Sequence, residues 1–470
     1  MNARIPLESV EQSLYEVRKK IYPRAVHGAF ASCRWGLVFA TQLVFYGLAW
    51  LEWNGRQAVL FDLAARKFYL FGLVLWPQDV IYLTVLLVIS ALSLFLFTAI
   101  AGRLWCGYAC PQTVYTEIFL WIERRIEGDR MARMKLDQSP NGARKVALKS
   151  AKHGAWIALS AWTGFTFVGY FTPIRDLMHS AATLDFGAWE WFWIGFYGFA
   201  TYGNAGWMRE QVCKYMCPYA RFQSAMFDSD TLVITYDAAR GEPRGSRAKK
   251  ADARALGIGD CVDCSICVQV CPTGIDIRNG LQYECIGCAA CIDGCDQVMD
   301  RMGYPRGLIR YSTENALKNG WDLRRIAARV LRPRVAIYTA ILGGIVVAAG
   351  TALFLRVPLK VDVIRDRNTL AREVEGGLVE NVYRLQVMNT IERPRRIEIA
   401  VEGDASLQGL ALVQDPGALE IPATASRLLT LRVRTMAGSA RGAKPITFVV
   451  TSNDGGPPVA VREKSRFLVP

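Results

Sequence analysis

The chain is organised around two cysteine runs, CVDCSICVQVCP at residues 261–272 and CIGCAACIDGCD at residues 285–296. Both have the spacing C-x2-C-x2-C-x3-C, and the first continues into Pro272 where the second has Asp296. In such a run three cysteines bind one iron-sulfur cube and the fourth binds the other cube. The spacing therefore predicts two 4Fe-4S clusters, with Cys261, Cys264, Cys267 and Cys295 as the ligands of the first and Cys285, Cys288, Cys291 and Cys271 as those of the second.

Zinc and disulfide bonds are the alternatives for these eight cysteines. Zinc ribbons separate their C-x2-C pairs by ~15–20 residues, whereas each run here packs its cysteines closely. Disulfides are disfavoured because the charge pattern places the block in the reducing cytoplasm. Pro272 is expected to turn the chain away after its ligand, and Asp296 at the matching place gives less support for a turn without removing a ligand. Because clusters carry single electrons, the block is predicted to be a relay.

Long apolar segments place the chain in a membrane. Hydrophobic residues make up 52% of the chain although 21% of residues are charged, so the apolar residues must be segregated. A segment of about 17 to 25 apolar residues can cross the bilayer as a helix. Five segments meet this description, at residues 36–53, 80–102, 154–172, 187–206 and 335–356.

The distribution of positive charge predicts the orientation. The chain has 56 Lys and Arg against 42 Asp and Glu, and the basic residues gather before the first span and between the second and third spans. Cytoplasmic loops carry such an excess. The predicted order is a cytoplasmic arm at 1–35, four spans within 36–206, a cytoplasmic domain at 207–334 that contains the two-cluster ferredoxin-like block at 255–302, a fifth span at 335–356 and an extracytoplasmic tail at 357–470. The basic residues flank spans and form no nucleic-acid-reading motif, so no nucleic-acid partner is expected.

The tail is predicted to be an all-β sandwich. Apolar and polar residues alternate at 383–387 and at 396–401, with turn-forming residues between such stretches. Alternation of this kind is typical of half-buried strands. The fold class is therefore multi-domain, with an α-helical membrane domain, an inserted ferredoxin-like domain and a C-terminal β-sandwich. The tail is expected to be a docking or stabilising module.

Two further motifs lie at the ends of predicted spans. WCGYACP at 105–111 and CKYMCP at 213–218 are both C-x3-C-P, and both fall on the cytoplasmic edge of the membrane. If they are helical, this spacing places both sulfurs of a pair on one face, and the proline breaks the helix. Soft sulfur ligands select Cu(I) or iron-sulfur clusters. We favour copper or thiol redox chemistry over a third cluster, and over simple packing, for the membrane-edge cysteines, which are Cys106, Cys110, Cys213 and Cys217. Cys33 is expected to be a packing residue.

The order of these motifs resembles the CcoG family, also called FixG or RdxA. The resemblance covers nearly the whole chain and includes WPQD at 76–79, WCGYACPQT from 105 and CKYMCPYARFQ from 213. It implies a cupric reductase of the bacterial inner membrane, which supplies Cu(I) for the copper centre of a cbb-type cytochrome c oxidase. It also implies an immunoglobulin-like periplasmic tail, and oxidase assembly factors or a copper chaperone or transporter as partners. The electron donor is not specified by the resemblance.

Two other functions fit the same motifs. The paired C-x3-C-P and the two-cluster block also resemble NapH and NosR type proteins, which implies a membrane ferredoxin that takes electrons from quinol. The third possibility is a non-catalytic oxidase assembly scaffold whose clusters only sense redox state or iron supply.

Overall fold

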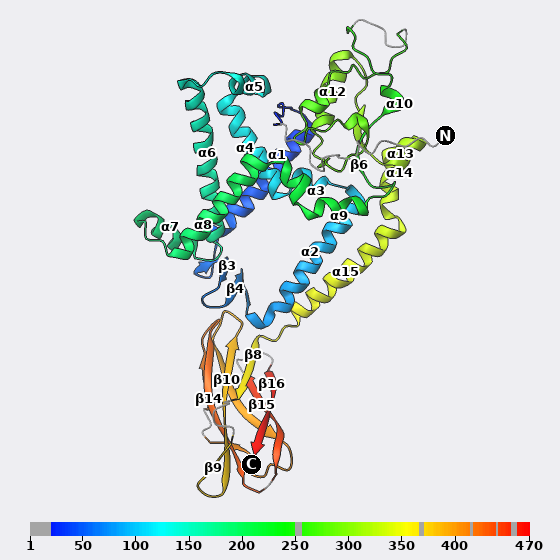
Figure 1. Ribbon diagram of the computed structural model, residues 1–470. Coiled ribbons are helices and arrows are strands. Elements are labelled where there is room, and N and C mark those ends of the chain that lie inside the picture. Colours follow the sequence, from blue (N-terminus) through cyan, green and yellow to red (C-terminus); the bar gives the residue numbers. More distant parts are fainter. Residues whose placement is uncertain (1–19, 250–255, 366–370, 414–416, 439, 453–457) are drawn as a thin grey trace, which may run out of the picture. The chain divides into compact units, whose positions relative to one another are not determined.

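The chain forms two compact units in the computed structural model, which describes residues 20–249, 256–365, 371–413, 417–438, 440–452 and 458–470 (Figure 1). Residues 1–19 of the predicted arm and residue 255 of the predicted block lie outside the described residues. Unit 1 comprises the chain up to Val44, then Ala91–Phe165 and Trp189–Ala340. Unit 2 comprises Phe45–Ser90, Thr166–Ala188 and Ile341–Pro470. The chain passes between the units five times, each time within a helix.

The five helices that contain these passages are α1 Ala29–Gly47, α2 Val80–Ala101, α6 Ala143–Val168, α8 Ala188–Thr201 and α15 Pro333–Phe354. Among the described residues, two helices are long and apolar enough to cross a membrane by length and composition, Pro77–Ala101 and Pro333–Phe354. Helix α8 has only 14 residues because the backbone then widens into a π-helical segment, η4 (Tyr202–Met208). Helix α1 ends at Gly47, earlier than the predicted span, and strands begin at Glu52.

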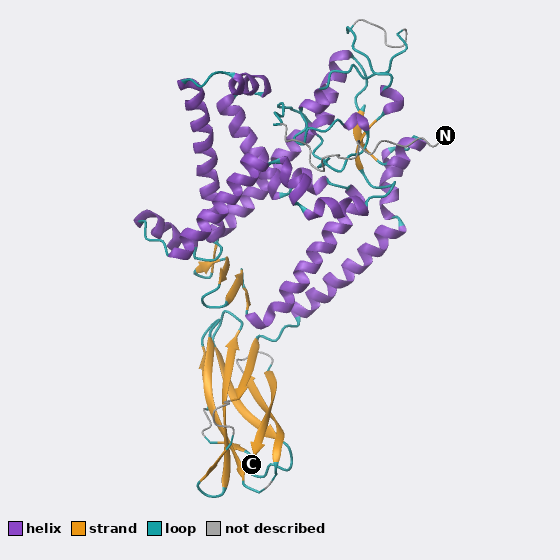
Figure 2. Cartoon of the chain, in the orientation of Figure 1, coloured by secondary structure: helices purple, strands orange, loops and turns teal. Residues whose placement is uncertain are grey.

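Unit 2 contains a sandwich of two antiparallel sheets. One sheet has the order β12-β14-β10-β8, with β9 also paired to β10, and the other has the order β13-β11-β15-β16. The bounds are β8 Leu359–Arg365, β9 Arg372–Val374, β10 Leu378–Asn389, β11 Arg395–Gly403, β12 Ala411–Leu412, β13 Leu419–Ile421, β14 Ser426–Met436, β15 Gly442–Ser452 and β16 Val459–Val469. After α15 the described residues form strands and loops and no helix (Figure 2).

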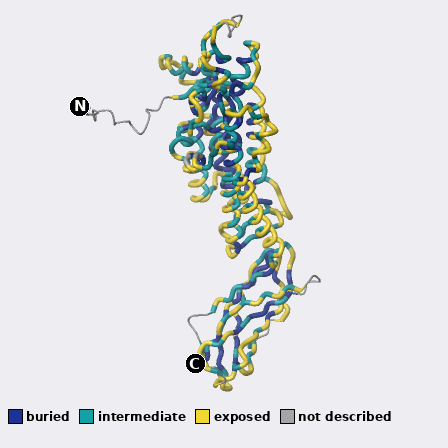
Figure 3. The backbone as a smooth tube through the Cα atoms, turned by 90° about the vertical axis from the view of Figure 1, so that its right-hand side faces the viewer, coloured by how far each residue is buried: buried dark blue, intermediate teal, exposed yellow. Residues whose placement is uncertain are grey.

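The alternating residues of the tail form the core of this sandwich. Tyr383 and Leu385 of β10 are fully buried, and Arg384 between them is exposed. Ile397 of β11 is also fully buried, and its neighbours Arg396 and Glu398 are exposed. The ring of Tyr383 packs edge-on against Phe448 of the opposite sheet, with centroids 5.1 Å apart. Buried residues recur along these strands between more exposed ones (Figure 3). The predicted β tail is therefore confirmed.

The rest of unit 2 consists of short elements: β1 Glu52–Trp53, β2 Arg56–Gln57, β3 Val59–Asp62, β4 Lys67–Leu70, β5 Leu73–Leu75, η3 Pro77–Asp79 and α7 Ile174–Thr183. The WPQD motif has a structural role among them. The buried carboxylate of Asp79 accepts a hydrogen bond from the Trp76 amide at 2.9 Å. It also forms ion pairs with Arg356 at 2.6 Å and with Lys360. Asp79 thus ties the start of α2 to the segment that leads into β8.

Unit 1 contains all thirteen cysteines of the chain. Strand β6 (Val233–Tyr236) pairs antiparallel with β7 (Ile309–Ser312) and so closes the segment that carries the two runs. The other elements are α3 Leu104–Tyr108, α4 Pro111–Glu127, α5 Arg130–Gln138, η5 Val212–Met216, α9 Pro218–Met226, α10 Ala238–Gly241, α11 Ile266–Gln269, η6 Ile277–Asn279, α12 Ala290–Met302, α13 Glu314–Asn319, α14 Leu323–Ala328 and η7 Arg329–Leu331.

The two cysteine runs end in different structures, and the difference follows from Pro272 in the first run and Asp296 in the second. Helix α11 ends before Cys271 and Pro272, whereas α12 continues through Cys295 and Asp296 to Met302. A proline would have removed a helical hydrogen bond at that point. Asp296 allows the helix to continue, and its carboxylate accepts a hydrogen bond from the Gly307 amide at 3.0 Å.

Candidate iron-sulfur site

The eight cysteines of the two runs line two cavities in unit 1. The cysteines that line one of them are Cys261, Cys264, Cys267 and Cys295. The cysteines that line the other are Cys271, Cys285, Cys288 and Cys291, with Cys267 also in its wall. We call them the first and the second cavity. Each draws cysteines from both runs, and the rest of each lining is mainly aliphatic.

The backbone around the two cavities repeats the same uncommon conformation. Residues before and after the second cysteine of each run have positive φ, at Asp263 (52°) and Ser265 (55°) and again at Gly287 (70°) and Ala289 (59°). Left-handed residues are uncommon outside glycine. Alternation of such residues with right-handed ones makes concave nests of amide groups, which suit anions and iron-sulfur clusters.

The electrostatics of the cysteines also fit a metal cluster. Burial raises the pKa of Cys267 to about 11 and that of Cys295 to about 12, and the neighbouring thiolates raise the pKa of Cys295 further. The same causes raise the pKa of Cys285 to about 12. Grouped buried thiols ionise only when a cation compensates them, and iron supplies that charge. Within the described residues no three His, Cys, Asp or Glu side chains could hold a single metal ion, and the thiols surround the cavities instead.

The two C-x3-C-P motifs share one local geometry. Cys106 lies in the short helix α3, and Cys110 is extended (φ −61°, ψ 128°) directly before Pro111 begins α4. Cys213 lies in η5, and Cys217 is extended (φ −77°, ψ 110°) directly before Pro218 begins α9. The expectation that both cysteines of a pair share one helical face is therefore wrong. A proline excludes the helical conformation from the residue before it, so the helix breaks at the second cysteine.

Cysteines of the two motifs lie within electrostatic range of one another. Burial raises the pKa of Cys106 to about 11, and negative charge on Cys110 and Cys217 adds to this effect. Burial raises the pKa of Cys213 to about 12, with contributions from all three other cysteines. The fold thus brings together two pairs that are far apart in the sequence.

The first motif rests directly on the second cavity. A Cβ atom added at Gly107 would lie 2.7 Å from the backbone N and Cα of Cys288. In turn, a Cβ added at Gly287 would lie 3.0 Å from the carbonyl oxygen of Arg103. Cys106 and Cys213 both pack on the apolar cluster that contains Cys288. No intervening layer separates the membrane-edge cysteines from the residues of the second cavity.

Three buried polar residues at this contact were not among the site residues predicted from the sequence. Arg103 donates hydrogen bonds to the carbonyl groups of Tyr283 and Ala220, and its charge opposes the rise in the pKa of Cys106. The guanidinium of Arg34 donates to the carbonyl of Cys288. The Gln223 amide lies 3.4 Å from the sulfur of Cys106. Their partners are distant in sequence, so spacing could not reveal them. The one available signal was an arginine at the end of an apolar span.

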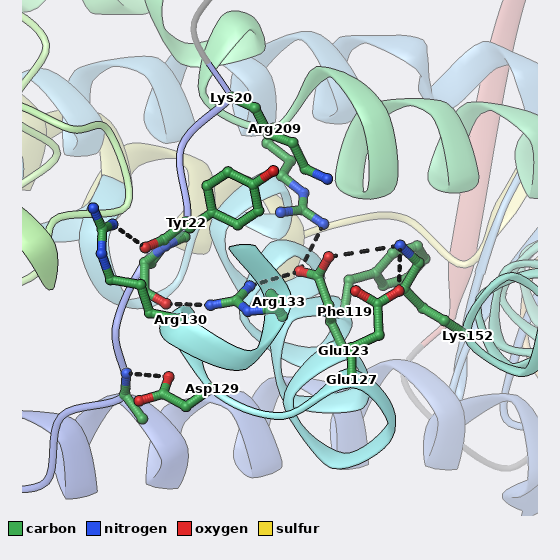
Figure 4. A network of polar contacts seen from close by, with 12 residues as sticks. Lys20, Tyr22, Phe119, Glu123, Glu127, Asp129, Arg130, Arg133, Lys152 and Arg209 are labelled. Atoms are coloured by element: carbon green, nitrogen blue, oxygen red, sulfur yellow. Dashed lines mark hydrogen bonds and ion pairs between the residues drawn. The ribbon is translucent and has the colours of Figure 1, made fainter. Parts of the chain in front are cut away.

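A buried ion-pair network supports the helices beside this site (Figure 4). Glu123 of α4 pairs with Arg133 at 2.9 Å and with Arg209, just before the second motif, at 3.1 Å. Burial alone would raise the pKa of Glu123, but Arg209, Arg133 and Lys152 lower it below its usual value. Arg133 also donates to the carbonyl of Pro23 in the N-terminal arm. The network joins the arm, α4, α5 and the approach to Cys213.

Comparison with known proteins identifies the family. The chain is 41% identical to the nitrogen fixation protein FixG of Rhizobium meliloti, over 84% of this chain and 81% of that protein. It is 38% identical to protein RdxA of Cereibacter sphaeroides, over 96% of this chain and 98% of that protein. The chain belongs to the FixG/RdxA family. The predicted resemblance is confirmed. A more distant relative, the ferredoxin-type protein NapH of Haemophilus influenzae, is 23% identical over 45% of this chain and 66% of its own length.

Family profiles assign the parts of this FixG/RdxA member. A 4Fe-4S dicluster domain matches residues 208–314, and a 4Fe-4S binding domain matches residues 83–128. The Ig-like fold at the C-terminus of FixG matches residues 349–470. The chain is thus an iron-sulfur electron-transfer protein of the membrane with an Ig-like C-terminal domain. These matches confirm the predicted ferredoxin-like and Ig-like parts.

Proposed function

We propose that this chain is a membrane cupric reductase that converts Cu(II) into Cu(I) at the membrane-edge cysteines. The observation that carries the proposal is the contact of Gly107 with Cys288, which leaves no layer between these cysteines and the second cavity. Electron transfer needs such proximity. The Cu(I) product would serve the copper centre of a cbb-type oxidase, through oxidase assembly factors or a copper chaperone or transporter.

The proposed cofactors are two 4Fe-4S clusters, one in each cavity. The first would bind Cys261, Cys264, Cys267 and Cys295, and the second Cys285, Cys288, Cys291 and Cys271. Support comes from the cysteines that line each cavity and from the repeated positive φ angles. When bound, such clusters supply single electrons at potentials that reach roughly −400 mV in plant-type ferredoxins, so reduction of Cu(II) is favourable.

The residues around the membrane-edge cysteines would hold the copper substrate. Cu(II) gains one electron to become Cu(I), and thiolates then bind Cu(I) more strongly than the nitrogen and oxygen ligands that Cu(II) prefers. Gln223 would orient the sulfur of Cys106, and Arg103 would compensate the negative charge of the thiolates. Cys110 and Cys217 lie at the helix breaks, and both are partly exposed.

The proposed topology has five spans in the bacterial inner membrane, with the N-terminal arm and residues 207–334 in the cytoplasm and the sandwich in the periplasm. Each of the five passages between the units falls within a helix, and each such helix overlaps one of the five predicted spans. The basic connection at 103–153 fits a cytoplasmic location. The most apolar stretches of α2 and α15 have no buried residues, as expected for surfaces that face lipid.

A second candidate function has an observation of its own. The first C-x3-C-P lies within residues 83–128, which match a 4Fe-4S binding domain, and the chain is related to NapH. These matches favour a third cluster at the membrane-edge cysteines. The chain would then be a membrane ferredoxin that passes electrons from quinol to another protein, without a copper substrate.

Replacement of Cys106 and Cys213 by serine together separates the two functions. Protein purified without oxygen is reduced with dithionite and given Cu(II), and Cu(I) is measured with a chromogenic chelator. We expect the double variant to lose at least about 90% of the rate and to keep about eight iron atoms per chain, because the cluster ligands are intact. Cys33→Ser, at an exposed cysteine outside both motifs, is the matched control and should leave both quantities unchanged.

Two results would count against the cupric reductase. One is an unchanged rate of Cu(II) reduction in the double variant. The other is a fall from about twelve iron atoms per chain to about eight, which would assign the membrane-edge cysteines to a third cluster.

A further inference from the structure

The two cavities differ in how they meet the surroundings. Cys264 of the first cavity is exposed, whereas Cys288 of the second is buried beneath Gly107 and Arg34. The hydroxyl of Tyr311 covers the same wall and donates to the Gly287 carbonyl at 2.7 Å. Cys267 lines both cavities and connects them. A second protein can therefore approach the first cavity closely, while the second cavity faces the membrane-edge cysteines.

A positively charged segment borders the exposed cavity. Residues 240–249, here called the basic strap, contain Arg240, Arg244, Arg247 and Lys249 against one acidic residue, Glu242. Backbone hydrogen bonds hold the strap against the start of the first run, from Gly245 N to the Cys261 carbonyl at 3.2 Å and from Cys261 N to the Gly241 carbonyl at 3.4 Å. Arg240 pairs with Asp260 at 2.5 Å and Arg244 lies 3.9 Å from Glu242, which leaves the strap with a net positive charge. Arg244 and Lys249 are exposed to solvent.

We propose that a small acidic electron-carrier protein docks on the basic strap and delivers single electrons at the first cavity. The inference rests on the proposed function and names its electron donor by class. In each encounter the carrier is oxidised by one electron and this chain is reduced by one, with no bond made or broken. Opposite charges raise the association rate of such short-lived complexes, which form small interfaces and weaken as salt rises.

The test uses the full chain in detergent with its clusters intact and a bacterial flavodoxin, a small acidic flavin protein, as the probe. The dissociation constant is measured at about 50 and 200 mM salt. In the charge-reversal variant Arg244→Glu with Lys249→Glu, we expect binding at low salt to weaken at least about tenfold and the salt dependence to flatten. The matched control, Arg144→Glu with Arg324→Glu, changes the charge equally at exposed sites outside the strap and should bind as the parent does.

The same samples distinguish failure of this inference from failure of the proposed function. Dithionite needs no docking surface, so dithionite-driven Cu(II) reduction and iron content should be unchanged in the strap variant. If flavodoxin does not bind at about 100 μM and low salt, or if the control loses binding equally, the inference is wrong. It is also wrong if electrons enter only from quinol in liposomes. None of these results alters the dithionite-driven rate, which tests copper reduction alone.

Discussion

At the scale of single residues, the contact between Gly107 and Cys288 decides what the site can do. Only a residue without a side chain allows the backbone of α3 to approach the second cavity so closely. Neighbouring side chains then secure the contact, because Arg34 and Arg103 donate to carbonyl groups in the segment that carries the second run. The glycine of the first C-x3-C-P motif is therefore required for the close approach of the membrane-edge cysteines to the cysteines of the second cavity.

Gly107→Ala should therefore impair electron transfer without removing a ligand. The added Cβ would lie 2.7 Å from the backbone of Cys288, and relief of such overpacking costs about 1–3 kcal/mol. We expect a lower thermal unfolding temperature and Cu(II) reduction slowed about tenfold at unchanged iron content. Gly343→Ala is the control, because no atom lies within 4 Å of a Cβ added there. Parent-like stability and rate in the Gly107 variant would contradict the role of the contact.

At the scale of elements, the two C-x3-C-P motifs have the same local backbone structure. In each, a short helix carries the first cysteine, the second is extended, and a proline starts the next helix. The proline predicts a helix break, and the break lies before the proline because proline disfavours the helical conformation of the residue that precedes it. The second copy differs in its π-helical turn, which no pattern of apolar residues signals.

Strand pairing in the sandwich gives a pH-dependent prediction. Glu380 of β10 is fully buried between Arg372 of β9 and Arg434 of β14. Burial alone would raise its pKa, but these ion pairs lower the pKa below its usual value. A depressed folded-state pKa means that the ion pairs stabilise the fold at neutral pH, and that this contribution disappears as the pH falls through the folded-state pKa.

Glu380→Gln should accordingly lower the stability of β10 by about 1–3 kcal/mol at pH 7 and by much less near pH 3. Hydrogen exchange of the β10 amides in the full chain measures the difference at both pH values. Glu398→Gln changes an exposed carboxylate on β11 and serves as the control. An effect of equal size at both pH values would show that the ion pairs are not its source.

At the scale of the whole molecule, the chain alternates between two units, and the chemistry is confined to one of them. All thirteen cysteines belong to unit 1 and the sandwich belongs to unit 2. If the passages are membrane spans, protease added to intact spheroplasts should remove the tail after about residue 356 and spare the cysteine-containing part. Inverted vesicles should show the opposite pattern. Digestion of the tail only in inverted vesicles would reverse the proposed orientation.

Much of this organisation follows from the sequence because it rests on local repeats. The cysteine spacing at 261–295 predicts a two-cluster domain, and alternation at 383–387 predicts strands that face a common core. Contacts between distant segments could not be derived in this way. Arg34 and Gln223 contact cysteines more than a hundred residues away. The long apolar helices α2 and α15 are far easier to recognise in the sequence than the shorter α8.

The sharing of cysteines between the two cavities has a consequence for biogenesis. Each cavity takes its thiols from both runs, so neither set is complete until the ribosome has made the second run, the second set at Cys291 and the first at Cys295. Metal insertion must then follow synthesis of the second run. Because the cavities share Cys267 in their walls, we expect an unfilled cavity to leave the wall of the other poorly ordered. Loading should consequently be all-or-none, and cells short of iron should accumulate apoprotein rather than half-filled chains.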